Sequence, residues 1–416
     1  MKYWLSSLFI LGIGSSSVLA NPIQTPFIFP TARVLPKGVR NLSYKGAVID
    51  ANRKFDENGQ NVSIAEPFFQ PLSFEKIMEG ETDPAKRGLI EDTMNALGAN
   101  TNDSFGQTTG QINVKVNAHV PVFAWGVTKR ITVAAVVPIV NSSLNVDSGV
   151  LQENQALHAQ MIADIKSKGA SSKVVEFIEK MNQPIPEKLK EYGYDPLTNE
   201  NKTKLGDIRL ISKYQAMSNS KNRLTFTGAV NLPTGQDQRV NKVVDVISGD
   251  GQTDLAVGAD YDFLLNERFT LSVGTLYTVQ LADQNAERIP ERVDSKLSPD
   301  VDPETERNLG DILMVAAATS FNYQGFQAAA GYNLQVRQRD QYSGTLYEQG
   351  RYQWLGEETK QRMHSALAMI GYNTIHLFKQ KKFPIPLGVS LTHVQVLGGE
   401  NVVNDGLTAL DMSIFF

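Results

Sequence analysis

The segment Arg268–Gln280 reads RFTLSVGTLYTVQ and shows the pattern that decides the fold. Because successive side chains of a β-strand point to opposite faces, this segment has one mostly apolar face and one mostly small or polar face. The apolar face carries Phe269, Leu271, Val273, Thr275, Tyr277 and Val279. A tilted strand crosses a bilayer in about 9–11 residues, whereas strands of soluble sandwiches usually have about 5–6. The segment is therefore predicted to be a membrane-spanning strand.

The same alternation recurs along the chain and predicts an all-β fold, a transmembrane antiparallel β-barrel of about 12 strands, with 14 as the alternative. Short turns follow the even-numbered segments and long loops follow the odd-numbered ones, which is typical of bacterial outer-membrane barrels. The expected strands are 39–50, 110–123, 130–141, 205–217, 222–233, 252–264, 267–280, 309–322, 325–338, 363–378, 385–397 and 407–416.

Composition agrees with this interpretation and excludes several classes of protein. The 416 residues include no cysteine, which excludes disulfides, thiolate metal sites and cysteine nucleophiles. A formal net charge of -4 gives no basic excess for nucleic-acid binding. The mean hydropathy of -0.24 is compatible with a barrel, because every second strand residue faces its interior and the loops are polar.

The N-terminal region indicates export. Lys2, the apolar run Leu5–Ile13 and the small residues before Ala20 predict a signal peptide over 1–20, with an N-terminal membrane anchor as the alternative. Residues 21–38 are predicted to be either a periplasmic leader or a small plug in the barrel lumen. The plug candidates are Phe27, Ile28 and Phe29, since these apolar side chains would be costly to expose to water.

Two loops of the predicted barrel (39–416) are large, namely 51–109 and 142–204. Both are expected to be extracellular and to contain helices, at 72–80, 84–97, 152–168 and 171–181. Loops of this length usually act as lids or binding elements, and surface decoration is the alternative. The loop 281–308 is charged and interrupted by proline, and it is expected to be mobile.

The last segment is expected to close the barrel, because a sheet in a membrane must leave no unpaired edge. Its outward face would carry Leu410, Met412, Ile414 and the terminal Phe416, while Ala409, Asp411 and Ser413 point the other way. Aromatic residues near the short turns predict an interfacial girdle. These are Phe263, Phe269, Phe321, Tyr323, Phe326, Phe378 and Phe416.

Several stretches resemble a known family. A terminal strand that ends in phenylalanine resembles the assembly signal of bacterial outer-membrane proteins. The stretches Leu205–Tyr214, Gly228–Gly235, Asp254–Gly258 and Leu309–Ile312 resemble motifs of the outer-membrane transporters grouped with the meta-pathway phenol-degradation proteins. That family is distantly like the long-chain fatty-acid transporters. The resemblance covers roughly 205–416 and implies import of hydrophobic compounds, and the long 142–204 insertion departs from it.

Charged residues on the predicted lumen face are the candidate functional residues. They would line or plug a water-filled interior, or form structural ion pairs that fix the strands. Lys213 and Asp260 are expected at similar depths. The full set is Lys115, His119, Arg209, Lys213, Asp254, Asp260, Asp262, Arg337 and Asp411.

Three functions are compatible with these observations. The first is a channel or transporter for small, hydrophobic or aromatic molecules in the bacterial outer membrane. The second is a structural or surface-interaction barrel, and the third is a barrel enzyme of the phospholipase or protease type. No catalytic triad, metal-ligand set or cofactor motif is recognisable in the sequence. The expected partners are outer-membrane lipid, the barrel-assembly machinery and a small hydrophobic ligand, with no nucleic acid.

Overall fold

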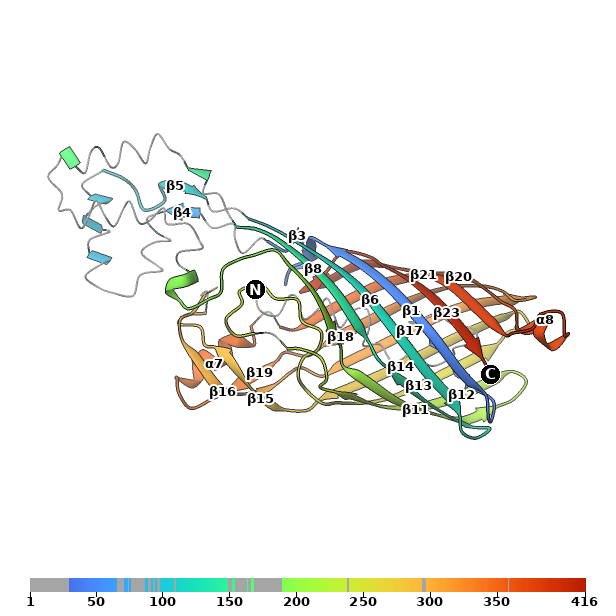
Figure 1. Ribbon diagram of the computed structural model, residues 1–416. Coiled ribbons are helices and arrows are strands. Elements are labelled where there is room, and N and C mark those ends of the chain that lie inside the picture. The colour runs from blue at the N-terminus through green and yellow to red at the C-terminus, as the bar shows by residue number, and fades with distance from the viewer. Residues whose placement is uncertain are drawn as a thin grey trace. The chain divides into compact units, whose positions relative to one another are not determined.

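The computed structural model contains a closed antiparallel barrel of twelve strands (Figure 1), which confirms the predicted fold. It describes residues 30–416 apart from 238, 294–296 and 358 and parts of 66–97, 108–109, 149–151 and 154–188. The barrel strands are β1 (Arg40–Ala51), β6 (Gly110–Gly126), β7 (Ile131–Val136), β11 (Ile208–Ser218), β12 (Asn222–Leu232), β13 (Asp254–Leu264), β14 (Phe269–Gln280), β17 (Ile312–Tyr323), β18 (Phe326–Arg337), β20 (Gln361–Asn373), β21 (Leu387–Glu400) and β23 (Leu407–Phe415).

Two further strands belong to the same sheet, which explains why fourteen was a reasonable alternative. β8 (Ile139–Ser148) follows β7 after a break at 137–138, and β10 (Glu200–Leu205) precedes β11 before a break at 206–207. β8 and β10 pair with each other, as β7 and β11 do. The ring itself has twelve strands, and β8 and β10 extend it beyond β7 and β11.

The final residue closes the ring. β23 pairs with β1 in an antiparallel register that runs from Asn41 opposite Phe415 to Ile49 opposite Leu407. Beyond the strand, Arg40 donates its backbone N–H to Phe416 at 2.8 Å, and Phe416 donates back at 3.0 Å. On its other side β1 pairs with β6. The closing role predicted for the last segment is thus confirmed.

Short connections lie at one end of the barrel, and we call this the short-turn end. The tightest joins β17 to β18 through Gln324 (φ 48°) and Gly325 (φ 87°). Two consecutive positive φ angles match the twist of a two-residue hairpin. A side chain at position 325 would lie 2.2 Å from the carbonyl oxygen of Asn373, so the turn also needs glycine for space. Another of these connections contains the short helix α8 (Ile375–Lys379).

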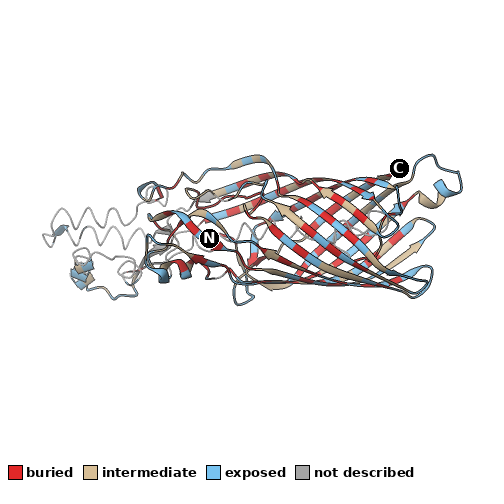
Figure 2. Cartoon of the chain, turned by 90° about the horizontal axis from the view of Figure 1, so that it is seen from below, coloured by how far each residue is buried: buried red, intermediate tan, exposed pale blue. Residues whose placement is uncertain are grey.

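Burial alternates along each strand (Figure 2), so inward and outward faces are distinct. The outward face carries exposed apolar side chains around the ring, such as Leu210, Val257, Val273 and Ile370. Aromatic side chains border this belt at the short-turn end, where the rings of Phe269 and Phe321 lie 5.0 Å apart. Such a belt is the lipid-facing surface of a membrane barrel. No helix among the described residues is long and apolar enough to cross a membrane.

The two large loops form a second compact unit, residues 64–112 and 145–198. A small sheet joins them, with β4 (Pro71–Ser73) and β9 (Gln152–Glu153) on either side of β5 (Ser104–Gln107). The helices expected from 72 and 152 therefore begin as strands, because both segments pair with β5. Within the predicted helices, helical residues are described at 75, 87–88, 91–92, 94–95, 163 and 166–167. The remainder of these predicted helices lies outside the described residues, as do the signal peptide (1–20) and 21–29.

The remaining long loops of the barrel are ordered. β2 (Arg53–Phe55), β3 (Asn61–Ser63) and β22 (Val402–Val403) form one small sheet, and β15 (Asp283–Arg288), β16 (Val301–Asn308) and β19 (Gln341–Ser343) form another. The second sheet packs with helix α7 (Gln349–Leu355) around a core of Ile289, Leu309, Tyr342, Tyr352 and Leu355. We call this group the loop cap. The segment 281–308, which was expected to be mobile, instead contributes strands β15 and β16 and the buried Ile289 to this group.

Candidate functional site in the barrel interior

One wall of the barrel interior is apolar. Direct cross-strand partners place one residue from each of five neighbouring strands (β6, β1, β23, β21 and β20) in a continuous row. The row is Val116, Ile49, Leu407, Val394 and Leu367, and all five side chains are buried. A second row, towards the short-turn end, is Ala118, Ala47, Ala409, Thr392 and Met369. We call these two rows the apolar wall.

The facing wall is polar. Across β11, β12, β13 and β14 the register aligns Arg209, Asn231, Asp254 and Gln280. Asn231 donates to Asp254 at 2.7 Å. A water-filled porin has polar side chains all around its interior. The combination of one polar and one apolar wall is different, because the two rows of the apolar wall offer an apolar molecule contact with hydrocarbon on one side of the interior.

Seven of the nine residues expected to face the lumen do point inward. Lys213 and Asp260 are brought together, with a Nζ–Oδ2 distance of 2.7 Å. Asp411 pairs with Lys45 across the closing seam, and Arg337 pairs with Asp340 at 2.8 Å. Asp262 accepts a hydrogen bond from Ser272 at 2.8 Å. The remaining inward residues are Arg209 and Asp254, described above.

Lys115 and His119 lie on the opposite face from the one expected. Lys115 is the cross-strand partner of Asp50, and His119 hydrogen-bonds the outward-facing hydroxyl of Tyr44. The reason is that β6 reverses the usual polarity in the half of the strand that lies away from the short-turn end. There its valines and alanines face the lumen, and its polar residues face out. The sequence showed the alternation clearly but not which face was inside.

The described N-terminal segment, residues 30–36, contacts the interior near the short-turn end. The backbone carbonyl of Thr31 accepts a hydrogen bond from Lys213, and that of Ala32 accepts from Gln215 at 2.8 Å and from Thr225 at 2.6 Å. Further along, Leu35 donates its N–H to Thr132 at 2.8 Å. Strands β7, β11 and β12 therefore hold the segment. The plug candidates Phe27, Ile28 and Phe29 lie outside the described residues.

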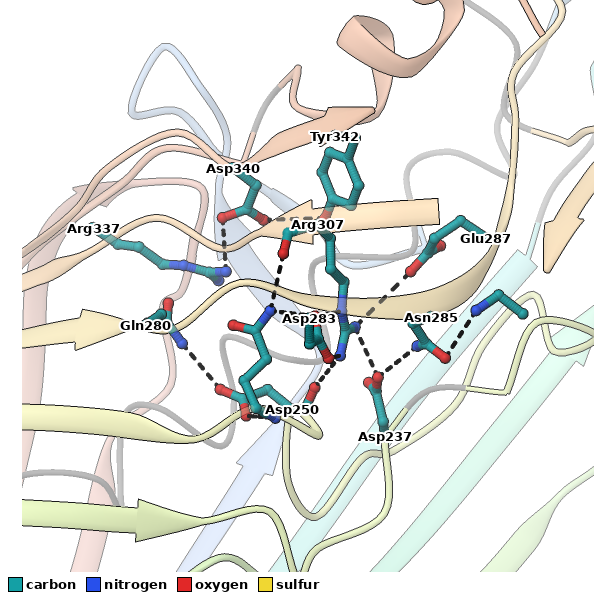
Figure 3. Close-up of polar contacts among 12 residues, drawn as sticks. Asp237, Asp250, Gln280, Asp283, Asn285, Glu287, Arg307, Arg337, Asp340 and Tyr342 are labelled. Carbon is teal, nitrogen blue, oxygen red and sulfur yellow. Dashed lines mark hydrogen bonds and ion pairs between the residues drawn. The ribbon is translucent and has the colours of Figure 1, made fainter. Parts of the chain in front are cut away.

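At the long-loop end, Arg307 on β16 connects two loops of the barrel (Figure 3). Its guanidinium forms ion pairs with Asp237 at 2.7 Å and with Asp283 at 2.8 Å, and it donates to the backbone carbonyl of Asp250. Burial alone would lower the pKa of Arg307, but the hydrogen bonds to Asp283 and the neighbouring carboxylates raise it. Burial raises the pKa of Asp250. The charged cluster thus fixes the loop cap to the loop 233–253.

The loop 233–253 is the feature that the sequence analysis missed. Its residues from Lys242 to Gly249 are all buried, although they form no regular structure. Lys242 pairs with Glu200 on β10 at 2.7 Å, and Ser248 donates to the carbonyl of Leu205 at 2.7 Å. The loop therefore packs on the inward side of β10. The apolar run Val243–Ile247 was the available signal, since an exposed loop has little use for four branched apolar side chains.

In the described part of the chain, no group of three or more histidine or carboxylate side chains has a geometry that could hold a metal ion. Three histidines sit on the outward face. His364 hydrogen-bonds Tyr332, and His393 hydrogen-bonds Thr408 at 3.0 Å. With His119, each of these rings has a hydroxyl partner on the neighbouring strand. The arrangement stabilises strand pairing and contributes nothing to the interior.

Comparison with known proteins supports the fold. No family model and no curated protein sequence matches the chain. An outer membrane channel of Pseudomonas putida F1 is similar in structure, with a TM-score of 0.52 and 10% identity over 92% of this chain and 98% of that one. The toluene transporter TbuX of Ralstonia pickettii has a TM-score of 0.35 and 10% identity, covering 92% and 90%. A FadL homologue of Pseudomonas aeruginosa has a TM-score of 0.34 and 10% identity, covering 98% and 97%.

Proposed function

We propose that this protein is a channel of the bacterial outer membrane for small hydrophobic molecules, including aromatic ones. The apolar wall is the single observation that carries the proposal. Its side chains offer no favourable contact to ions or sugars, because the transfer of such solutes to an apolar surface is costly. An apolar solute gains about 25 cal/mol for each Å² of its surface removed from water. The two rows cross five neighbouring strands and so offer that surface inside the barrel.

The described conformation is a closed form of this channel. The side chains of the apolar wall are buried, and the cavity beside Ile49 and Leu407 has a volume of only about 20 Å³. Passage therefore requires movement. The segment 30–36 is the element we propose to move, because a few hydrogen bonds to Lys213, Gln215, Thr225 and Thr132 hold it. In this account the described residues 30–36 act as a plug rather than as a free leader.

The similarity to a solved outer membrane channel supports transport over the alternatives of a purely structural barrel or an enzyme. The resemblance of several stretches to motifs of the meta-pathway transporters supports a hydrophobic substrate. We further propose that the assembly machinery of the outer membrane recognises the closing strand, which ends in the exposed Phe416. The expected lipid partner is the bilayer around the apolar belt.

Uptake by cells tests the proposal. A strain that lacks this protein should accumulate a radiolabelled monoaromatic hydrocarbon more slowly than the same strain complemented with the gene, while uptake of a small sugar should not differ. The intact outer membrane matters here, because phospholipid vesicles pass such molecules without a protein. Equal hydrocarbon uptake in both strains would contradict the proposed function.

A further inference from the structure

A small cavity interrupts the apolar wall beside β18 and β20. It is lined by the apolar side chains Ile49, Met363, Val394, Val396, Val403 and Leu407. Three polar residues also line it, namely Asn333, Ser365 and Asp405. Its volume of about 20 Å³ accommodates little more than one hydroxyl group or one water molecule.

Asn333 and Ser365 have no partner within the protein. They are direct cross-strand neighbours on β18 and β20 and both face the lumen, with exposed fractions of 3% and 1%. Yet the amide oxygen of Asn333 and the hydroxyl of Ser365 make no hydrogen bond, either to each other or to another group. Leaving a buried polar group without a partner is unfavourable by about 1–3 kcal/mol. Two such groups side by side in a mostly apolar pocket therefore indicate a hydrogen-bonding partner that is not part of the chain.

The strand geometry at Ser365 is also irregular. The pairing of β20 with β21 shifts between His364 and Ser365, so that His364 lies opposite Gly398 while Ser365 lies opposite Val396. Such bulges re-aim a side chain and are frequent beside binding sites. The third polar residue is partly engaged, because the Oδ2 atom of Asp405 accepts the backbone N–H groups of Asn52 at 3.1 Å and Arg53 at 3.4 Å. The buried hydrogen-bonding atoms of the cavity that lack a partner are the amide oxygen of Asn333 and the hydroxyl of Ser365.

We propose that Asn333 and Ser365 form a binding site for the hydroxyl group of a small apolar molecule such as an alkylphenol. The hydroxyl would donate to the amide oxygen of Asn333 and accept from Ser365, while the apolar part of the molecule lies against the apolar wall. Met363 is the side chain that would make room, because an unbranched thioether readily adopts other rotamers. The inference rests on the proposed function and deepens it, since it selects hydroxylated molecules among the hydrophobic ones.

Binding of a matched pair of probes to the full-length protein in one detergent tests the inference. The probes are 4-butylphenol and butylbenzene, which differ by the hydroxyl alone, and the readout is the ratio of their affinities by calorimetry. For the wild type we expect 4-butylphenol to bind at least about fivefold more tightly than butylbenzene. This factor corresponds to the lower end of the free energy that is lost when a buried polar group has no hydrogen-bond partner. In Asn333→Leu/Ser365→Ala the ratio should fall to about one, with the affinity for butylbenzene retained.

Ser413→Ala is the matched control, because Ser413 also faces inward but lies near the short-turn end on β23. It should keep the wild-type ratio. Heat-modifiable migration of the folded barrel on gels shows that each variant is assembled. Equal affinity of the wild type for both probes, as expected if the cavity holds only a water molecule, would overturn this inference and leave the channel intact as a proposal. Failure to bind either probe would instead contradict the proposed function.

Discussion

Replacing Lys213 with methionine should release the segment 30–36 from the barrel wall. Lys213 is buried, pairs with Asp260 and donates to the backbone carbonyl of Thr31. A hydrogen bond from a charged donor is worth about 1.5–3 kcal/mol and a neutral one about 1 kcal/mol. Three neutral hydrogen bonds also hold the segment, two donated by Gln215 and Thr225 and one donated by the Leu35 N–H, and Thr31 donates a fourth to the carboxylate of Asp262. The substitution therefore removes roughly 2 of about 7 kcal/mol.

A loss of about 2 kcal/mol shifts an opening equilibrium by roughly 30-fold. In planar bilayers, Lys213→Met should therefore open far more often than the wild type, with longer open times. Lys45→Met is the control, because it removes another buried inward lysine that pairs with an aspartate, Asp411, at the closing seam. Unchanged open probability in Lys213→Met, with the barrel assembled, would refute the role of the segment as a plug. An equal increase in open probability in both variants would show that the loss of any buried ion pair causes the effect.

Other predictions concern the loop cap and the hairpin. Arg307→Met removes the cation that pairs with Asp237, Asp283 and Glu287, so protease cleavage within the cap should be at least about tenfold faster, given the several kcal/mol that a broken buried pair costs; cleavage at the wild-type rate would contradict this. Burial raises the pKa of Asp250 above its usual 3.8, so the folded loop 233–253 binds this proton more tightly than the unfolded chain, and this loop together with the cap fixed to it should become more stable as the pH falls from neutral towards that value. Thermal unfolding of the cap, followed by the fluorescence of Trp354 on α7, should show this gain in stability, and Asp250→Asn should reduce the gain. An identical pH dependence in the variant would show that Asp250 is not the source of the gain. Gly325→Val should slow barrel assembly, because a β-branched residue is strained at φ 87° and meets the Asn373 carbonyl; normal folded yield would argue against a tightly constrained hairpin.

The strands were predictable because their signal is local. Alternation over a segment such as 268–280 needs no knowledge of the rest of the chain, and every expected strand is present. Closure by the last segment was predictable from the requirement that no edge face the membrane. The proximity of Lys213 and Asp260 followed from strand order and depth alone.

Which face of each strand points into the lumen was harder to predict, because this depends on which side chains line the lumen. For most strands the apolar face is outside, but on β6 the apolar Val116 and Ala118 face inward while His119 faces out. A channel with an apolar wall breaks the simple rule of polar inside and apolar outside. The buried loop 233–253 and the unpartnered pair Asn333–Ser365 depend on tertiary contacts, which no single stretch of sequence encodes.

The most direct test of the central claim changes the polarity of the apolar wall without changing its shape. Val114→Thr/Val116→Thr replaces one methyl group with a hydroxyl at Val116 of the apolar wall and at Val114, the next buried inward residue of β6, and Val257→Thr makes the same change on the exposed outward face of β13. Complemented cells carrying the double variant should take up a monoaromatic hydrocarbon several-fold more slowly than wild type, while Val257→Thr should match wild type. Wild-type uptake by the double variant, with normal amounts of assembled barrel, would contradict a hydrophobic path along this wall.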